Sequence, residues 1–290
     1  MNKFLSLVSL SVVLFFSACQ KESDENIVNP VEKPASAPKA PTGRVTGITA
    51  ATDLFVLGGD NLYRVSATTR QATLIGSGWS GTEALTVNPY TNSVYGVQAD
   101  HLWKVNLSNG AVLDYGPRWG GTEAITNSGE VSRVAGEIYA VQGGSLWGVS
   151  AVENRFGYKL GNGNWTGTVD MSYDLAYSHI VAIQGNVMWS TRPPQGTYVR
   201  VNSHLDFTGT VAYVYTGWHH LYVRAGRLWK NGAMLGTADW TGTQAITYAG
   251  NYMWIVKNSV VYQVDYDNGN VIATVPGITN AYGVESYECK

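Results

Sequence analysis

Cysteine is nearly absent from this chain of 290 residues, which contains only Cys19 and Cys289. Two cysteines rule out the disulfide framework that holds many small secreted domains together. If Cys19 is modified, as argued below, Cys289 has no partner inside the chain. We therefore expect no intramolecular disulfide and an inert thiol at Cys289, near a closing strand.

Charged residues are also scarce. Asp, Glu, Lys and Arg together make up 14% of the chain, and the formal net charge is −2. No stripe of Lys and Arg runs along any segment, as a protein that follows phosphate groups would need. The composition therefore predicts that nucleic acid is not a partner.

The chain lacks the residue patterns of familiar catalytic sites. It has no Gly-x-Ser-x-Gly sequence and no phosphate-binding loop before a helix. His219 and His220 are neighbours on an expected strand, so their side chains point to opposite faces and cannot easily share a metal. The other histidines are spread along the chain: His101, His179 and His204. We predict no catalytic residues, no cofactor, no metal site and no enzymatic activity.

The chain does contain a sequence motif in two parts, which occurs six times. The first part is an aromatic residue followed by x-Gly-Thr. It begins at Trp79, Trp119, Trp165, Phe207 and Trp240, and a degenerate copy begins at Val45. The second part is a strand, a tight turn and a strand, as in residues 93–105 and 137–149. Intervals near 40 residues, built only of short strands, are typical of a propeller blade.

One repeat can be divided into four strands. In residues 82–87 successive side chains alternate between two faces, as expected of an inner strand. Asn88 and Pro89 then begin a turn. Strands are then expected over 94–98, 101–105 and 111–115, and no segment from residue 43 to 290 has the pattern of an amphipathic helix. The repeats predict an all-β fold, a six-bladed β-propeller of four-stranded antiparallel blades.

The ring is expected to close by pairing of its two ends. Residues 278–281 resemble the start of an inner strand and should join the sheet of the first blade, which removes exposed sheet edges. The repeat glycines Gly81, Gly121, Gly167, Gly209 and Gly242 lie where a loop enters an inner strand. We expect backbone angles or close packing there that a β-carbon would disturb.

The first 18 residues have the character of a signal peptide. Lys3 is followed by an apolar run from Phe4 to Phe16, which is too short and too abruptly ended for a stable membrane span. Residues 16–19, Phe-Ser-Ala-Cys, resemble the lipobox of bacterial lipoproteins, and the resemblance implies cleavage before Cys19 and lipidation of Cys19. An ordinary secretory signal with a chance cysteine is the alternative.

The domain boundaries follow from composition. Residues 19–43 are rich in Pro, Ala, Lys and Glu, and are predicted to be a disordered tether behind the lipidated cysteine. Residues 44–290 are predicted to be the propeller. The acidic residues after Cys19 resemble the export signal of Bacteroidetes surface lipoproteins. We therefore expect a lipid-anchored protein of the bacterial outer membrane on the cell-surface side, with the periplasmic side as the alternative.

Aromatic residues are abundant, with 10 Trp and 18 Tyr. Most should fill the space between blades, including Trp103, Trp147, Trp189 and Trp229 on the third strands. The tryptophans that open the inner strands follow polar, glycine-containing loops, where an exposed indole could stack on a sugar. The predicted carbohydrate-binding residues are Trp79, Trp119, Trp165, Trp240, Asn164 and Asp239.

The second repeat carries a family resemblance. Residues 72–79, ATLIGSGW, lead through LTVNP (85–89) to VYGV (94–97) and HLWK (101–104), and this order resembles a tachylectin-2-type repeat. Similar phrases occur in all six copies. The resemblance implies a β-propeller lectin for N-acetylated amino sugars. This family has five blades, however, and its inner strand is richer in aromatic residues than GTEALTV (81–87).

Two classes of function follow. The first is a membrane-anchored, multivalent carbohydrate-binding propeller, a monomer with glycans or glycoconjugates as partners, in which several weak sites act together. The second is a non-catalytic scaffold that binds a protein partner in an outer-membrane complex, with variable apolar loops on one face. An enzyme is a distant third, because the inner strands offer mainly Thr, Ala, Leu and Ile.

Overall fold

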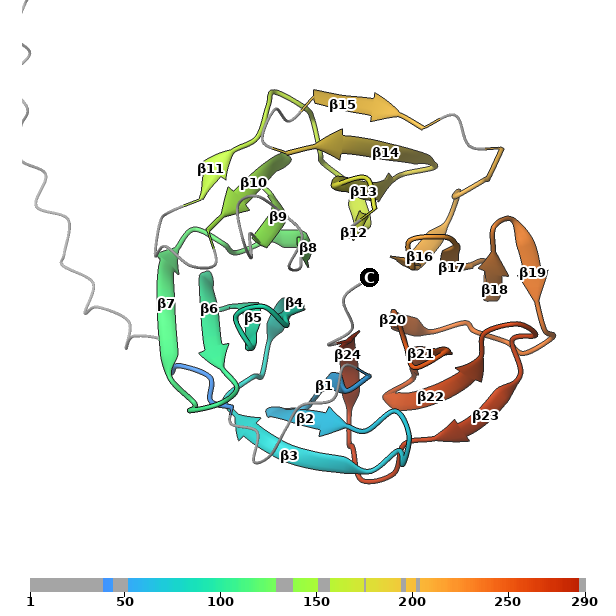
Figure 1. Ribbon diagram of the computed structural model, residues 1–290, viewed down its shortest axis with the longest axis horizontal. Coiled ribbons are helices and arrows are strands. Elements are labelled where there is room, and N and C mark those ends of the chain that lie inside the picture. The colour runs from blue at the N-terminus through green and yellow to red at the C-terminus, as the bar shows by residue number, and fades with distance from the viewer. Residues whose placement is uncertain are drawn as a thin grey trace, which may run out of the picture. The chain divides into compact units, whose positions relative to one another are not determined.

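The computed structural model describes residues 39–43, 52–128, 138–150, 157–174, 176–193, 197–201 and 204–286. The described residues form six four-stranded antiparallel sheets that surround a central axis as the blades of a propeller (Figure 1). The predicted all-β, six-bladed architecture is confirmed. Among these residues there is no helix with the length and apolar character that crossing a bilayer requires.

We name the strands of each blade A to D from the axis outward. Blade 1 contains β24 (Ala281–Ser286), β1 (Leu54–Gly58), β2 (Asn61–Val65) and β3 (Ala72–Ser77). Blade 2 contains β4 (Thr82–Asn88), β5 (Ser93–Gln98), β6 (His101–Asn106) and β7 (Val112–Pro117). Blade 3 contains β8 (Thr122–Asn127), β9 (Ile138–Gln142), β10 (Ser145–Val149) and β11 (Tyr158–Lys159).

The other three blades follow the same order. Blade 4 contains β12 (Thr168–Asp174), β13 (His179–Gln184), β14 (Val187–Arg192) and β15 (Thr197–Arg200). Blade 5 contains β16 (Thr210–Tyr215), β17 (His220–Arg224), β18 (Arg227–Lys230) and β19 (Ala233–Leu235). Blade 6 contains β20 (Thr243–Ala249), β21 (Tyr252–Lys257), β22 (Val260–Asp265) and β23 (Val271–Thr274).

The ring closes within blade 1, as expected, because β24 from the C-terminal end pairs with β1. The closing strand begins at Ala281, however, and not at residue 278. Asn280 has a φ of 53°, so the chain is still turning at this point. The β-carbon that Gly58 lacks would lie 2.7 Å from Ile278, so the glycine gives this turn its room.

The core is divided among the blade junctions. Each of the six hydrophobic clusters combines buried residues from two neighbouring blades, such as Phe55 and Leu62 of blade 1 with Val94 and Val105 of blade 2. Because each sheet is covered on both faces, its B strand is largely apolar. An example is β1, in which all five residues are buried.

The x-Gly-Thr phrase forms one turn repeated around the ring. In blade 4, the backbone N–H and the hydroxyl of Thr168 both donate to the carbonyl of Trp165, at 3.2 and 2.7 Å. The glycine at the third position of such a turn needs a positive φ. All five repeat glycines have one: Gly81 (74°), Gly121 (70°), Gly167 (77°), Gly209 (72°) and Gly242 (84°). The prediction of special backbone angles is confirmed.

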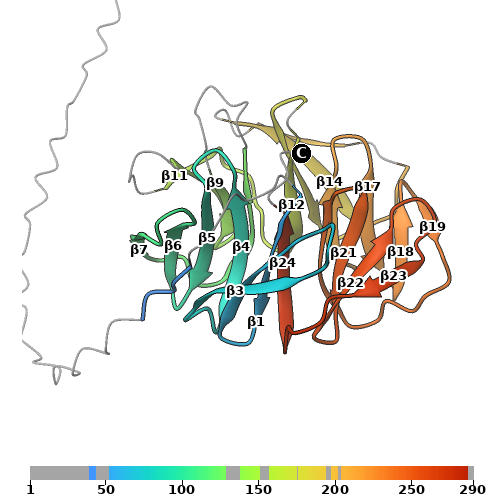
Figure 2. The same cartoon turned by 60° about the horizontal axis from the view of Figure 1, so that its bottom comes forward.

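The propeller has two faces, and the strands of the blades run between them (Figure 2). The linker face carries the D-to-A connections, which contain the x-Gly-Thr turns, and the B–C hairpins. The turn face carries the A–B and C–D turns, because successive antiparallel strands end on alternate faces. These two names are used below.

Residues 39–43, which the composition assigns to the tether, contact the propeller. Thr42 donates its backbone N–H to the carbonyl of Ser77 at 2.8 Å and accepts the indole N–H of Trp79 at 2.6 Å. Pro41 and Gly43 are buried. The compact unit therefore includes residue 39, earlier than the expected boundary at 44. Cys19 and Cys289 lie outside the described residues.

Candidate functional site

The tryptophans predicted to bind sugar are buried. The exposed fractions are 0% for Trp79, 4% for Trp119, 2% for Trp165 and 1% for Trp240. A sugar ring cannot stack on an indole that is covered on both faces. The prediction that these four rings are exposed stacking platforms is therefore wrong.

The reason lies in the position of these residues between two blades. Trp240 belongs to the same cluster as Leu221 and Val223 of blade 5 and Ile255 of blade 6. The loop crosses from one blade to the next at this point, and the indole fills the junction. The third-strand residues Trp147, Trp189 and Trp229 are only half-buried, so the expected order of burial is reversed for them.

The polar residues predicted in these loops bind their own backbone. Asn164 accepts the N–H of Thr166 through Oδ1 at 3.1 Å. The Oδ1 of Asp239 accepts the N–H and the hydroxyl of Thr241 at 2.9 and 2.7 Å. The Thr241 N–H, together with Lys257 nearby, holds the pKa of Asp239 below its usual range. These contacts cap the turn, which is a structural role.

A repeated contact on the linker face was not foreseen from the sequence. The last residue of each B strand in blades 2 to 6 donates to carbonyls of the preceding linker. Gln184 donates to the carbonyls of Asn164 and Thr166 at 2.9 and 2.7 Å. The other members are Gln98, Gln142, Arg224 and Lys257. Alignment of the six repeats at this position would have revealed a long hydrogen-bond donor in each of these blades.

The A strands line a central cavity of about 210 Å³. Each A strand from β4 to β20 has a bulge immediately after its first threonine, and the bulged residues line the cavity. Glu83, Glu123, Asp170 and Glu285 bring four carboxylates to its wall, more acid than the sequence indicated. Glu83 accepts the backbone N–H of Gly121 at 2.7 Å. Among the described residues, no group of His, Cys, Asp and Glu could hold a metal ion.

Among the described residues, the three most exposed Trp and Tyr side chains lie instead at A–B turns of the turn face, on three different blades. Tyr90 of blade 2 is 50% exposed, Tyr177 of blade 4 is 68% exposed, and Trp218 of blade 5 is 83% exposed. Each belongs to the turn that follows its A strand. Their rings, at equivalent places on one face, are therefore the candidate binding residues of this structure.

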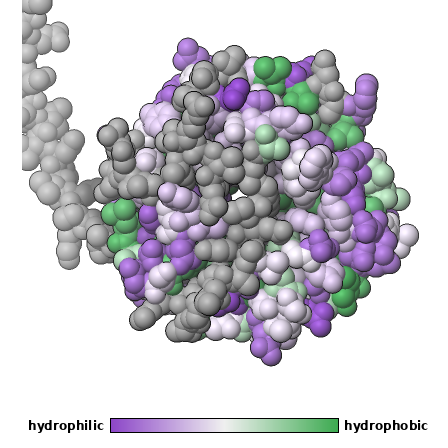
Figure 3. All heavy atoms as spheres, viewed as in Figure 1, coloured by the Kyte–Doolittle hydropathy of each residue, from purple (hydrophilic) through white to green (hydrophobic). Residues whose placement is uncertain are grey.

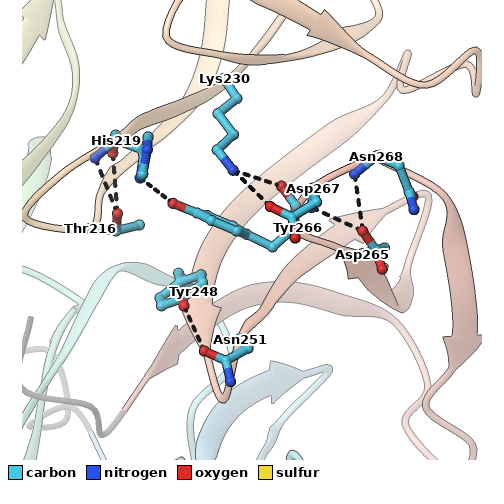
Figure 4. Close-up of polar contacts among 9 residues, drawn as sticks. All are labelled: Thr216, His219, Lys230, Tyr248, Asn251, Asp265, Tyr266, Asp267 and Asn268. Carbon is cyan, nitrogen blue, oxygen red and sulfur yellow. Dashed lines mark hydrogen bonds and ion pairs between the residues drawn. The ribbon is translucent and has the colours of Figure 1, made fainter.

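The turn containing Trp218 lies beside a polar and aromatic cluster from blades 5 and 6 (Figure 4). His219 shares a hydrogen bond with the hydroxyl of Tyr266, and the Nζ of Lys230 lies 3.6 Å from the centre of the Tyr266 ring. Lys230 also contacts Asp267 at 3.1 Å. These contacts hold the base of the turn in place, and leave its tip in solvent.

The two neighbouring histidines have different partners. His220 Nδ1 lies 3.0 Å from the hydroxyl of Tyr213, inside blade 5, whereas His219 contacts blade 6. Burial, together with the nearby His219, lowers the pKa of His220 to about 4. Burial and Lys230 also lower the pKa of His219. His220 is therefore neutral at physiological pH.

The described surface on one side of the ring is mixed in character. Viewed down the ring, the described residues show a mixture of hydrophilic and intermediate colours with small separate hydrophobic patches (Figure 3). No broad apolar area appears among the described residues on the face drawn there. A ligand that combines hydroxyl groups with small apolar faces fits such a surface better than a large apolar ligand does.

Comparison with known proteins supports the fold. No family model matches the chain, and no curated protein matches it in sequence. A structure of a nidogen/laminin complex aligns with 82% of this chain and 99% of its own, with a TM-score of 0.64 and 13% identity. The WD40 repeats of RRP9 align with 81% of this chain and 80% of their own, with a TM-score of 0.53 and 8% identity.

A bacterial protein shows the same architecture. PorZ, a surface component of the type-IX secretion system of Porphyromonas gingivalis, aligns with 84% of this chain at 14% identity and a TM-score of 0.53. The match covers 35% of the PorZ chain, so this chain spans about a third of that protein. At such identities the likeness shows the fold alone, which is that of a β-propeller.

Proposed function

We propose that this chain is a non-catalytic, surface-tethered propeller that binds carbohydrate through its turn face. The observation that carries the proposal is the exposure of Tyr90, Tyr177 and Trp218 at equivalent turns of three blades. The repeat resemblance favours N-acetylated amino sugars as ligands. The site thus moves from the linker face, where the tryptophans are buried, to the opposite face.

The chemistry of the turn face suits a sugar. A pyranose ring has an apolar face that can lie on an indole or phenol, while its hydroxyls bind neighbouring polar groups. Such groups are present in the cluster beside the turn that contains Trp218 (Figure 4), including Thr216, Asn251 and Asp267. Rings on three blades also allow weak sites to act together on a repeated glycan.

A glycan array tests the proposal. The chain from residue 19, with Cys19→Ser, is expected to bind a defined set of glycans. Trp218→Ala should weaken binding about tenfold, as expected when one aromatic contact is lost. The control is Tyr158→Ala, on an outer strand, which should leave binding unchanged. Absence of glycan binding would remove the carbohydrate proposal.

Anchoring is proposed to depend on Cys19. The residues Phe16-Ser17-Ala18-Cys19 form the lipobox-like sequence, and attached acyl chains would hold the protein at the outer membrane. Cys19→Ser should release the chain from the membrane fraction or leave it unprocessed. A Cys19→Ser protein of mature size that still fractionates with membranes would contradict this proposal.

A protein-binding scaffold is the second candidate. It is favoured by the shared architecture with PorZ, a surface component of a secretion system. If the array shows no glycan binding, the same turn-face variants can be tested for loss of a co-purifying membrane protein. A loss caused by Trp218→Ala but not by Tyr158→Ala would favour the scaffold.

A further inference from the structure

Residues 39–43 occupy the junction of blades 1 and 2, where they bind the end of β3 and the linker that follows it. Thr42 makes four hydrogen bonds there: its N–H and its hydroxyl donate to the carbonyl of Ser77, its hydroxyl accepts the N–H of Ser77, and its carbonyl accepts the indole N–H of Trp79. The equivalent indole N–H groups of Trp119, Trp165 and Trp240 are buried without a hydrogen-bond partner. Within the described part of the chain, such an additional segment is found at junction 1/2 alone.

The end of β3 is shaped to receive this segment. An added β-carbon at Gly76 would lie 1.8 Å from the Thr42 carbonyl oxygen, and one at Gly78 would lie 3.3 Å from Ala40. No side chain could stand at Gly76 without displacing the segment. Gly43 lies farther in, near Leu62 and Val105. The segment is therefore seated in a close-fitting groove.

The contacts also define the direction of the chain. Ala40 lies against Gly78, Thr42 against Ser77, and an added β-carbon at Gly76 would meet Gly43. The segment therefore runs antiparallel to the end of β3, which leads into the linker to blade 2. It follows that the chain enters the propeller from the linker face, opposite the turns that carry Tyr90, Tyr177 and Trp218.

We infer that the docked segment orients the propeller on the membrane, with the linker face toward the bilayer and the turn face away from it. This inference rests on the proposed anchoring at Cys19. A flexible coil of 20 residues, as the composition predicts for residues 19–38, would have a root-mean-square span of roughly 25 Å. Strands of about six residues separate the faces by roughly 20 Å or more, so the attached face lies nearer the bilayer on average. The exposed rings then remain accessible to ligands in the surroundings.

Energy transfer to a labelled bilayer tests this inference. The full chain from residue 19, with Cys289→Ser, is coupled through Cys19 to a maleimide lipid in phosphatidylcholine vesicles with acceptor-labelled headgroups. One protein carries an orthogonally labelled unnatural amino acid as donor at Asn186, on the linker-face hairpin, and another carries it at Trp218. Transfer is expected to be greater from position 186 than from position 218.

Release of the segment provides the matched control. Thr42→Pro removes the N–H and the hydroxyl, and so three of the four hydrogen bonds, without altering any strand. The variant should make the two transfer efficiencies approach each other, and should speed hydrogen exchange at the Trp79 indole N–H. Gly76→Val should do the same by occupying the groove, and serves as the second variant if Thr42→Pro folds poorly.

The outcomes separate this inference from the proposed function. Equal transfer from positions 186 and 218 in the parent protein, or greater transfer from 218, would overturn the orientation. A difference that persists in a folded Thr42→Pro protein would also overturn it, since the docked segment would not be its cause. Chemical coupling makes the measurement independent of natural lipidation, and glycan binding in solution is measured without vesicles.

Discussion

Trp240 is an example of a tryptophan whose burial at a blade junction stabilises the fold. The side chain is 1% exposed and lies between blades 5 and 6, with its ring perpendicular to that of Tyr262 at 5.7 Å. Trp240→Ala should lower the free energy of unfolding by about 3–5 kcal/mol, because a large cavity would remain. Trp229→Ala, at a half-buried third-strand position, should cost less than half as much. Chemical denaturation measures both, and equal costs would contradict this account of the core.

A glycine is required at position 167 because of its backbone angle, and not because space for a side chain is lacking. Its φ is 77°, and nothing lies within 4 Å of an added β-carbon. Gly167→Ala should therefore destabilise the protein by about 1–2 kcal/mol through backbone strain alone. Gly167→Asn should cost less, because Asn tolerates this region better. A stability unchanged by Gly167→Ala would show that the turn relaxes to another conformation.

His220 should make stability depend on pH in the acidic range. Its pKa is about 4 in the folded protein, against an ordinary value of 6.5, because burial disfavours the charged form. Between pH 6.5 and 4, His220 is therefore protonated in the unfolded chain but neutral in the folded protein. The stability associated with neutral His220 is present above pH 6.5 and is lost as the pH falls from 6.5 toward 4, by at most about 3 kcal/mol.

Urea denaturation at several pH values measures this dependence. The variant His220→Gln keeps a polar side chain but cannot be protonated, so its stability should change less between pH 6.5 and 4. A parent and a variant with the same slope would show that His220 is not responsible.

At the scale of elements, the B strands brace the linkers. Gln184, at the end of β13, donates hydrogen bonds to the carbonyls of Asn164 and Thr166 in the linker between blades 3 and 4. Lys257 makes the equivalent contact with the linker between blades 5 and 6. Gln184→Leu should lower the free energy of unfolding by about 1–3 kcal/mol, since two hydrogen bonds are lost. Gln184→Lys should largely preserve stability, because lysine occupies this place in blade 6. Equal losses for Leu and Lys, measured by thermal unfolding, would contradict the bracing role.

The strands themselves could be read from local sequence. Residues 79–118 predicted strands that differ from β4 to β7 by at most two residues at any end, because the turn residues and the alternation act locally. The bulges after Thr82 and its equivalents could not be predicted. A bulge depends on how an inner strand bends toward the axis, and that curvature belongs to the ring.

At the scale of the whole molecule, closure through β24 should control cooperativity. Removal of residues 281–290 would expose the edge of β1, whose five residues are all buried in the closed ring. The truncated chain is expected to unfold at a lower temperature, in a broader transition, and to aggregate. Calorimetry and light scattering measure these changes, and an unaltered melting curve would show that closure does not hold the ring together.

Repetition in the sequence alone determined the class of fold, the number of blades and the closing pair of ends. Each of these follows from local patterns copied around a ring. Only the tertiary structure decided which aromatic residues are exposed. Trp240 follows a polar loop and looked accessible, yet the neighbouring blade covers it, whereas Trp218 projects from a turn that no blade covers. Burial depends on what lies across the junction, and those residues are distant in sequence. The docking of Thr42 on Ser77 and Trp79 is a contact of the same kind, made by a segment whose composition alone predicted a coil.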